Sequence, residues 1–142
     1  MRPRLRRAFL VLAAVAPACA LAGADPQADY MLHCMGCHVA DGSGSPGRVP
    51  SVRDSLPALS ASAAGRRFLV QVPGAAQSPL SDLELAQVLS WMIRNLSARP
   101  VSSDFRDFTA GEVARYRKTP LVDVPGTRAQ LLSEALKRRG RA

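Results

Sequence analysis

The residues with the clearest chemical meaning are Cys34 and Cys37, which His38 follows directly. Two cysteines three positions apart and then a histidine form the Cys-x-x-Cys-His spacing of covalent haem attachment. Residues three apart share one face of a helical turn, so both sulfurs can reach the two vinyl groups of one porphyrin. His38 would then lie beneath the iron as its proximal ligand. The pattern predicts one covalently attached haem c.

Other kinds of site use the same residue types. A Cys-x-x-Cys pair also occurs in thioredoxin-like redox proteins, and a short match can arise by chance. A zinc site would need a second pair of ligands. Outside the motif, His33 is the only other histidine or cysteine of residues 25 to 142. His33 is turned about a hundred degrees from Cys34 on the same helix, which indicates a surface position and not a ligand.

The segment after His38 has loop chemistry, because Asp41-Gly42-Ser43-Gly44 and Gly47-Arg48-Val49-Pro50 are rich in turn residues and have no helical period. With Tyr30 ahead of the motif, this order of features resembles the small monohaem c-type cytochromes of class I. The resemblance covers residues 26 to 97 and implies an all-α, cytochrome c-like fold that wraps a haem. It also implies that the Pro50 carbonyl accepts a hydrogen bond from the second ring nitrogen of His38, which would fix the tautomer of the ligand.

The sixth iron ligand is less clearly marked. In the resembling family a methionine usually comes from the loop before the last helix, here residues 70 to 80, but this loop contains none. Met31 and Met35 are tied to the strip around the cysteines, so Met92 is the remaining candidate. Met92 also lies on an apolar helical stripe, where methionine often fills gaps in a core. Both roles stay open, and an unbound Met92 would leave the sixth position open or occupied by water.

Helix signals before and after the motif predict how it is held. Asp25-Pro26 predicts the start of a helix that runs to about Cys34 and presents Tyr30 on one face. Residues 51 to 60 indicate turns, and residues 61 to 70 indicate a short helix that ends before Pro73-Gly74.

The strongest helix signal begins with the capping box of residues 81 to 84. The resemblance to class I cytochromes implies that Trp91 on this helix packs against Tyr30, because that family has an aromatic here that packs across the first helix. The same helix has one apolar stripe at three- and four-residue steps, made of Leu85, Val88, Leu89, Met92 and Leu96.

Residues 1 to 24 have the order of a secretory signal. Four arginines precede an apolar run from Ala8 to Ala16, which is short for a membrane span. Ala22-Gly23-Ala24 has the small residues of a cleavage site, so the mature chain is expected to begin at Asp25. The alternatives are a retained membrane anchor and a lipid attached to Cys19. Export to the periplasm fits the motif, because the resembling family receives its haem outside the inner membrane.

Charge is unevenly distributed along the chain. The net charge of +8 falls to +4 without the four signal arginines, and residues 25 to 97 carry −1 while residues 98 to 142 carry +5. The basic character therefore belongs to the signal and the C-terminal extension, and the sequence shows no aromatic–basic interleaving that would indicate a nucleic-acid partner.

The extension, residues 98 to 142, contains two further capping boxes. They predict helices from Thr109 to about Lys118 and from Thr127 to about Lys137. The basic run of Lys137, Arg138 and Arg139 suggests docking to a membrane surface or an acidic partner, and the alternative is an ordinary solvated helix end.

The expected function is that of a periplasmic electron carrier. Residues 25 to 97 are just enough to wrap one haem, and they contain no acid–base constellation or nucleotide-binding loop. The expected partners are a redox donor and a redox acceptor, and the resemblance suggests an exported dehydrogenase. The alternatives are a haem enzyme or gas sensor with an open sixth position, and a fixed haem subunit of a larger oxidoreductase.

Overall fold

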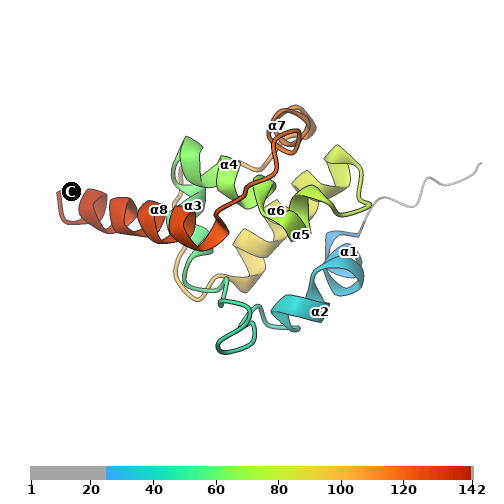
Figure 1. Cartoon of the computed structure of the whole chain (residues 1–142), viewed down its shortest axis with the longest axis horizontal. Coiled ribbons are helices and arrows are strands. Elements are labelled where there is room, and N and C mark those ends of the chain that lie inside the picture. The colour runs from blue at the N-terminus through green and yellow to red at the C-terminus, as the bar shows by residue number, and fades with distance from the viewer. Residues whose placement is uncertain (1–24, 142) are drawn as a thin grey trace, which may run out of the picture.

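The structure is a computed structural model that describes residues 25 to 141 (Figure 1). The predicted signal segment, including Cys19, lies outside these residues. Within them the chain forms eight helices and one isolated antiparallel bridge between Ser45 and Val49. The all-α prediction is therefore confirmed. No helix in the described range has the length and apolar character that a membrane crossing needs.

The helices vary widely in length. In chain order they are α1 (Pro26–His33), α2 (Met35–His38), α3 (Leu56–Ser60), α4 (Ala63–Gln71), α5 (Pro73–Ala76), α6 (Asp82–Leu96), α7 (Ala110–Tyr116) and α8 (Val124–Arg139). The prediction of turns over residues 51 to 60 holds for residues 52 to 55 and is wrong for residues 56 to 60, which form α3. Its Leu56 and Leu59 are 1% and 2% exposed, and burial of this kind stabilises short helices that local propensity leaves marginal.

The contact between α1 and α6 organises the centre of the fold. The predicted capping box is confirmed, because Ser81 Oγ accepts from the Glu84 N–H at 3.2 Å and Glu84 Oε2 accepts from the Ser81 N–H at 2.7 Å. The predicted aromatic contact is also confirmed, with the rings of Tyr30 and Trp91 5.5 Å apart between centroids. This pair fixes α1, and with it the start of the cysteine motif, against the longest helix of residues 25 to 97.

Of the two helices in the extension, one begins where the sequence predicted and the other begins earlier. Helix α7 starts after Thr109 as predicted, and Thr109 Oγ1 accepts from the Glu112 N–H at 3.2 Å. Helix α8 starts four residues earlier than predicted, because Asp123 and not Thr127 caps it, accepting from the Gly126 N–H at 2.9 Å. Pro125 in the first turn favours this earlier start, since proline suits positions whose N–H needs no helical partner.

The extension shares one core with residues 25 to 97. Its Phe108, Val113 and Leu131 are buried in the same cluster as Tyr30 and the apolar face of α6. The Phe108 N–H donates to the buried Ser90 Oγ on α6 at 2.8 Å, and that hydroxyl donates to the Ala86 carbonyl at 2.7 Å. Residues 98 to about 135 are therefore part of the packed domain, and the last turns of α8 project beyond it (Figure 1).

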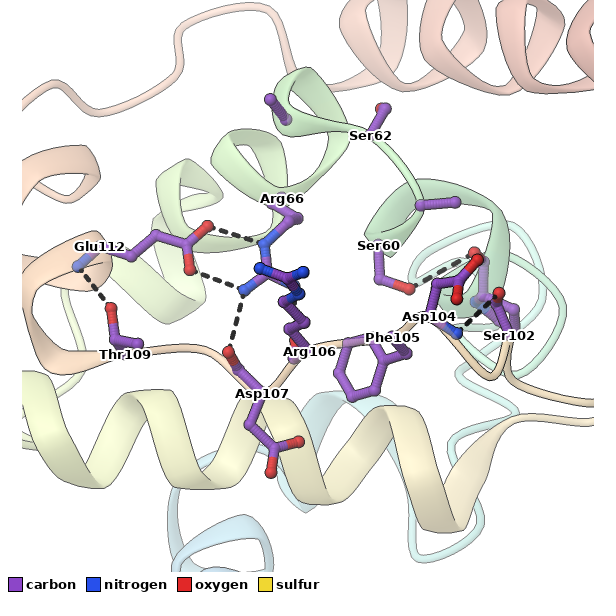
Figure 2. Close-up of a pocket in the computed structure, with 13 residues that line it drawn as sticks. Ser60, Ser62, Arg66, Ser102, Asp104, Phe105, Arg106, Asp107, Thr109 and Glu112 are labelled. Atoms are coloured by element: carbon purple, nitrogen blue, oxygen red, sulfur yellow. Dashed lines mark hydrogen bonds and ion pairs between the residues drawn. The ribbon is translucent and has the colours of Figure 1, made fainter.

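Arg66 on α4 is the main polar tie between the two parts. Its Nε and Nη2 donate to the two carboxylate oxygens of Glu112 at 2.7 and 2.6 Å, as Figure 2 shows. Its Nη1 donates to the Arg106 carbonyl at 2.8 Å, and its guanidinium carbon lies 3.9 Å from the centre of the Phe108 ring. The Arg66 and Glu112 side chains are only 15% and 14% exposed, so this bidentate pair is well shielded from water.

Arg66→Ala should therefore lower the free energy of unfolding by about 3 kcal/mol, because Glu112 would be left as a buried, unpaired carboxylate. Arg94→Ala is the matched control, since the Arg94 and Asp107 side chains of that ion pair are 52% and 57% exposed and should contribute less than about 1 kcal/mol. Chemical denaturation of the three proteins measures the difference. Equal losses of unfolding free energy in the two variants would show that the shielded Arg66–Glu112 pair stabilises the fold no more than the exposed pair does.

Candidate haem site

The cysteine motif forms one tight turn at the end of α1. The N–H groups of Cys37 and His38 both donate to the Cys34 carbonyl, at 3.2 and 3.0 Å. The two thiols are free, with Cys34 half-buried and Cys37 exposed. The predicted single-turn geometry of the two cysteines and the histidine is therefore present.

Burial changes the protonation of the groups in this turn. Burial and, to a smaller extent, the nearby Asp29 carboxylate together raise the pKa of the Cys34 thiol to about 11. Burial lowers the pKa of His38, so the imidazole stays neutral at pH 7, which is the form that binds a metal ion. His38 Nδ1 is buried and has no hydrogen-bond partner among residues 25 to 141. Buried polar atoms normally have a partner, so this ring is the unsatisfied group of the motif.

The loop after His38 folds back onto the motif at Gly44. The Gly44 N–H donates to the His38 carbonyl at 3.0 Å. A Cβ at Gly44 would collide with the Val49 carbonyl oxygen and lie 2.9 Å from the Pro50 carbonyl oxygen. Gly44 thus has His38 and Pro50 as neighbours, although the described residues contain no hydrogen bond between these two. The bond from His38 to the Pro50 carbonyl stays a prediction.

Gly44→Ala should destabilise this loop for two reasons, since Gly44 has a φ of +73° and no space for a methyl group. Gly47→Ala separates the cost of the left-handed backbone from the cost of the steric clash. Gly47 has nearly the same φ, +75°, but nothing lies within 4 Å of an added Cβ. The left-handed backbone alone should cost about 1 kcal/mol at either position. We expect Gly44→Ala to lose at least about 1 kcal/mol more than Gly47→Ala in denaturant unfolding. Similar losses would show that the close approach at Gly44 is unimportant.

Met92 lies on the buried, apolar face of α6. Its side chain is 5% exposed and belongs to the same apolar cluster as Cys34 and Met35. Leu96, one turn later on the same face, would be 3.4 Å from a Cβ at Gly42. The Leu96 end of this face of α6 therefore lies beside the loop that follows His38. The structure is compatible with both predicted roles of Met92, ligand and core side chain.

The loop before α6, residues 70 to 80, in which the resembling family usually has its methionine ligand, is held in place by Arg117 of the extension. The Arg117 guanidinium donates to the Leu80 and Ser78 carbonyls at 2.9 Å each and to Asp82 Oδ1 at 3.0 Å. It also reaches the Ala76 carbonyl at 3.3 Å. These bonds fix the chain between α5 and α6. No local sequence pattern marked Arg117, because its partners are backbone carbonyls more than 30 positions earlier.

Val39 is a second residue that the sequence did not single out. Its φ of 54° and ψ of 174° place a β-branched residue in a region that glycine favours, at a cost of about 1–3 kcal/mol. The Tyr30 hydroxyl donates to the Val39 carbonyl at 2.5 Å. Sequence reasoning gave Tyr30 only a packing role, and this bond adds a polar one. His33 is exposed, as predicted.

Two pockets of the described region lie elsewhere. A pocket of about 610 Å³ is lined by residues of α3, α4 and the segment before α7, among them Ser60, Arg66 and Arg106 (Figure 2). A second pocket, of about 480 Å³, lies around Arg94 and residues 97 to 101. Neither is lined by the cysteines, by His38 or by Met92, so the candidate haem site is a turn and a loop and not one of these pockets.

Comparison with known proteins gives no relative for this chain, because no family model and no curated protein matches it. Among residues 25 to 141 no three His, Cys, Asp or Glu side chains converge as a metal-binding group. The functional argument therefore rests on the motif and its geometry.

Proposed function

We propose that this protein is a c-type cytochrome that carries single electrons in the periplasm through one covalent haem. The observation that carries the proposal is the turn of residues 34 to 38, with two free thiols on one helical turn and a half-buried, neutral histidine directly after them. The resemblance to class I cytochromes extends this to a cytochrome c-like arrangement of residues 25 to 97. The redox donor would be an exported dehydrogenase or a similar protein.

The residues present fit a haem. Cys34 and Cys37 would form the two thioether bonds, and His38 would bind the iron with one ring nitrogen. The unpartnered Nδ1 of His38 fits this role, because ligand histidines usually donate their other ring N–H to a carbonyl or a carboxylate. Pro50 would supply that carbonyl, and Met92 would supply the sixth ligand.

Bound haem would supply the chemistry, a reversible one-electron exchange at iron. The chain's own residues would hold and shield it. Burial keeps His38 unprotonated, and the Gly44 N–H anchors the His38 carbonyl. The apolar face of α6 would exclude water from the haem.

The test is optical redox titration of the full chain after expression with a c-haem maturation system. A carrier should show a low-spin spectrum and one reversible, one-electron transition. A high-spin spectrum with ready binding of carbon monoxide would favour the second candidate, a haem enzyme or gas sensor with an open sixth position. The loop of residues 70 to 80, which lacks a methionine and is tied by Arg117, is the observation that keeps this candidate in view.

We also propose docking through the end of α8. Arg117 and Arg128 of the extension bond to backbone carbonyls inside the domain. Arg106, Arg115 and Lys118 are exposed and form no ion pair within the described chain, but the densest group of such basic side chains lies at the end of α8 and just after it: Lys137, Arg138, Arg139 and Arg141. These four charges equal the net charge of residues 25 to 142.

Replacing Lys137 and Arg138 with glutamate should slow reduction by the native donor and flatten the dependence of the rate on salt. Screening acts within about 8 Å at 0.15 M ionic strength, so the difference should shrink as salt rises. Replacing Arg115 and Lys118, two exposed basic residues of the same extension, with glutamate gives a control with the same net charge. Identical rates and salt slopes in both double variants would remove the docking proposal.

A further inference from the structure

The backbone directly after His38 has a conformation that its residue does not favour. Val39 has a φ of 54° and a ψ of 174°. The other residues with positive φ in the described chain are glycines, at positions 42, 44 and 47. A valine in this region persists only where surrounding contacts impose it. The question is which contact does so.

Three hydrogen bonds converge on Val39, and the shortest comes from Tyr30. The Tyr30 hydroxyl donates to the Val39 carbonyl at 2.5 Å, and the Gly42 N–H reaches the same oxygen at 3.3 Å. The Val39 N–H donates to the Met35 carbonyl at 2.8 Å. The last two bonds are local to the motif and its loop, so Tyr30 alone ties Val39 to another helix.

The anchor of this bond is rigid. Tyr30 is 1% exposed, and its ring lies against Trp91 of α6 with the two centroids 5.5 Å apart. The hydroxyl therefore transmits the position of the α1–α6 contact to the carbonyl that follows His38. Removing it would let Val39 relax toward negative φ, and the peptide joining Val39 to His38 would turn with it.

We propose that Tyr30 is a positioning residue for His38, holding the strained Val39 backbone so that the imidazole keeps one orientation toward the iron. The inference rests on the proposed haem function. It gives the aromatic position before the cysteine motif a role beyond packing, and it explains why valine is held in a backbone conformation that suits glycine.

The test is Tyr30→Phe in the full, haem-bearing chain, with two measurements. Hydrogen exchange of the Gly42 and Gly44 amides, which donate to the Val39 and His38 carbonyls, should become about tenfold faster. At a fixed ambient potential the ratio of ferrous to ferric protein should rise about threefold, because a less firmly held imidazole donates less to ferric iron. Exchange in α8 should not change.

Tyr116→Phe is the matched control, because the Tyr116 hydroxyl bonds to no group of residues 25 to 141 and its ring contacts Arg67 and Arg115 instead. Unchanged exchange at Gly42 and Gly44 in Tyr30→Phe would overturn the proposal. Faster exchange without a change in the redox equilibrium would overturn it too, since the hydroxyl would then be only a structural support.

Val39→Gly is the second variant, because glycine adopts positive φ without help. In this background Tyr30→Phe should change the exchange rates and the redox equilibrium much less than in the natural chain. Equal effects in both backgrounds would overturn the link to Val39. A chain that attaches no haem would end the proposed function and the positioning role, while exchange at Gly42 and Gly44 in that same chain would still report whether Tyr30 holds the turn.

Discussion

Replacing both Cys34 and Cys37 with serine should abolish covalent haem attachment, and the full chain should then lose its colour on extraction with acidified acetone. The reason is that serine keeps the size of the side chain but forms no thioether bond with a vinyl group. The natural chain should keep its colour, and each single variant should keep one bond and attach haem less completely. Absorbance of the protein after extraction measures the covalent fraction.

His38→Ala and His33→Ala form the companion pair for the iron ligand. His38 is half-buried, and its buried Nδ1 has no partner among residues 25 to 141, whereas His33 is exposed. The His38 variant should lose the low-spin spectrum, and the His33 variant should keep the spectrum of the natural protein. Haem that extracts completely from the natural chain would contradict the covalent site, and a normal spectrum in the His38 variant would contradict the ligand.

Met92→Leu should remove the near-infrared band of methionine-to-iron charge transfer from the ferric protein, if Met92 is the sixth ligand as proposed. A thioether ligand favours the ferrous state and raises the reduction potential, so the variant should also have a lower potential. Leucine keeps the size and apolar character of this buried side chain, so packing should change by less than about 1.5 kcal/mol. Near-infrared spectra and binding of imidazole or carbon monoxide measure the outcome.

Met31→Leu is the control for this substitution, because Met31 is a methionine of α1 that is 52% exposed. Its band and ligand affinity should match those of the natural chain. A band that survives in Met92→Leu would exclude Met92 and point to another residue or a partner chain. A natural protein that lacks the band and binds carbon monoxide readily would identify Met92 as a core side chain and favour the open-site alternative.

Local signals predicted several parts of the fold because the groups that determine them are close in sequence. The capping box at Ser81 and Glu84 is satisfied within four residues, and the apolar stripe of α6 follows from helical periodicity alone. The turn that places Cys34, Cys37 and His38 together follows from the same short-range geometry. The candidate site could therefore be read from the sequence, whereas the pairing of Tyr30 with Trp91 came from the family resemblance and not from a local signal.

Other features depend on partners that are far apart in the chain. Helix α3 forms because Leu56 and Leu59 find a core, which no signal in residues 51 to 60 reports. The Glu112 side chain, which a capping box would direct back to Thr109, is bound by Arg66 instead, 46 positions away. In the sequence, residues 98 to 142 differ from residues 25 to 97 in their basic charge and in having no resemblance to class I cytochromes. In the structure, burial of Phe108, Val113 and Leu131 makes most of that segment part of one core with the rest.

By itself the sequence determined the chemistry available at the site, since two thiols and an imidazole on one turn follow from five consecutive residues. Only the tertiary structure decided how that turn is held. The bond from Tyr30 to Val39 and the bonds from Arg117 to the loop before α6 both end on backbone carbonyls. Every residue has such a carbonyl, so no residue type marks which one a distant side chain will reach, and only the packed fold makes that choice.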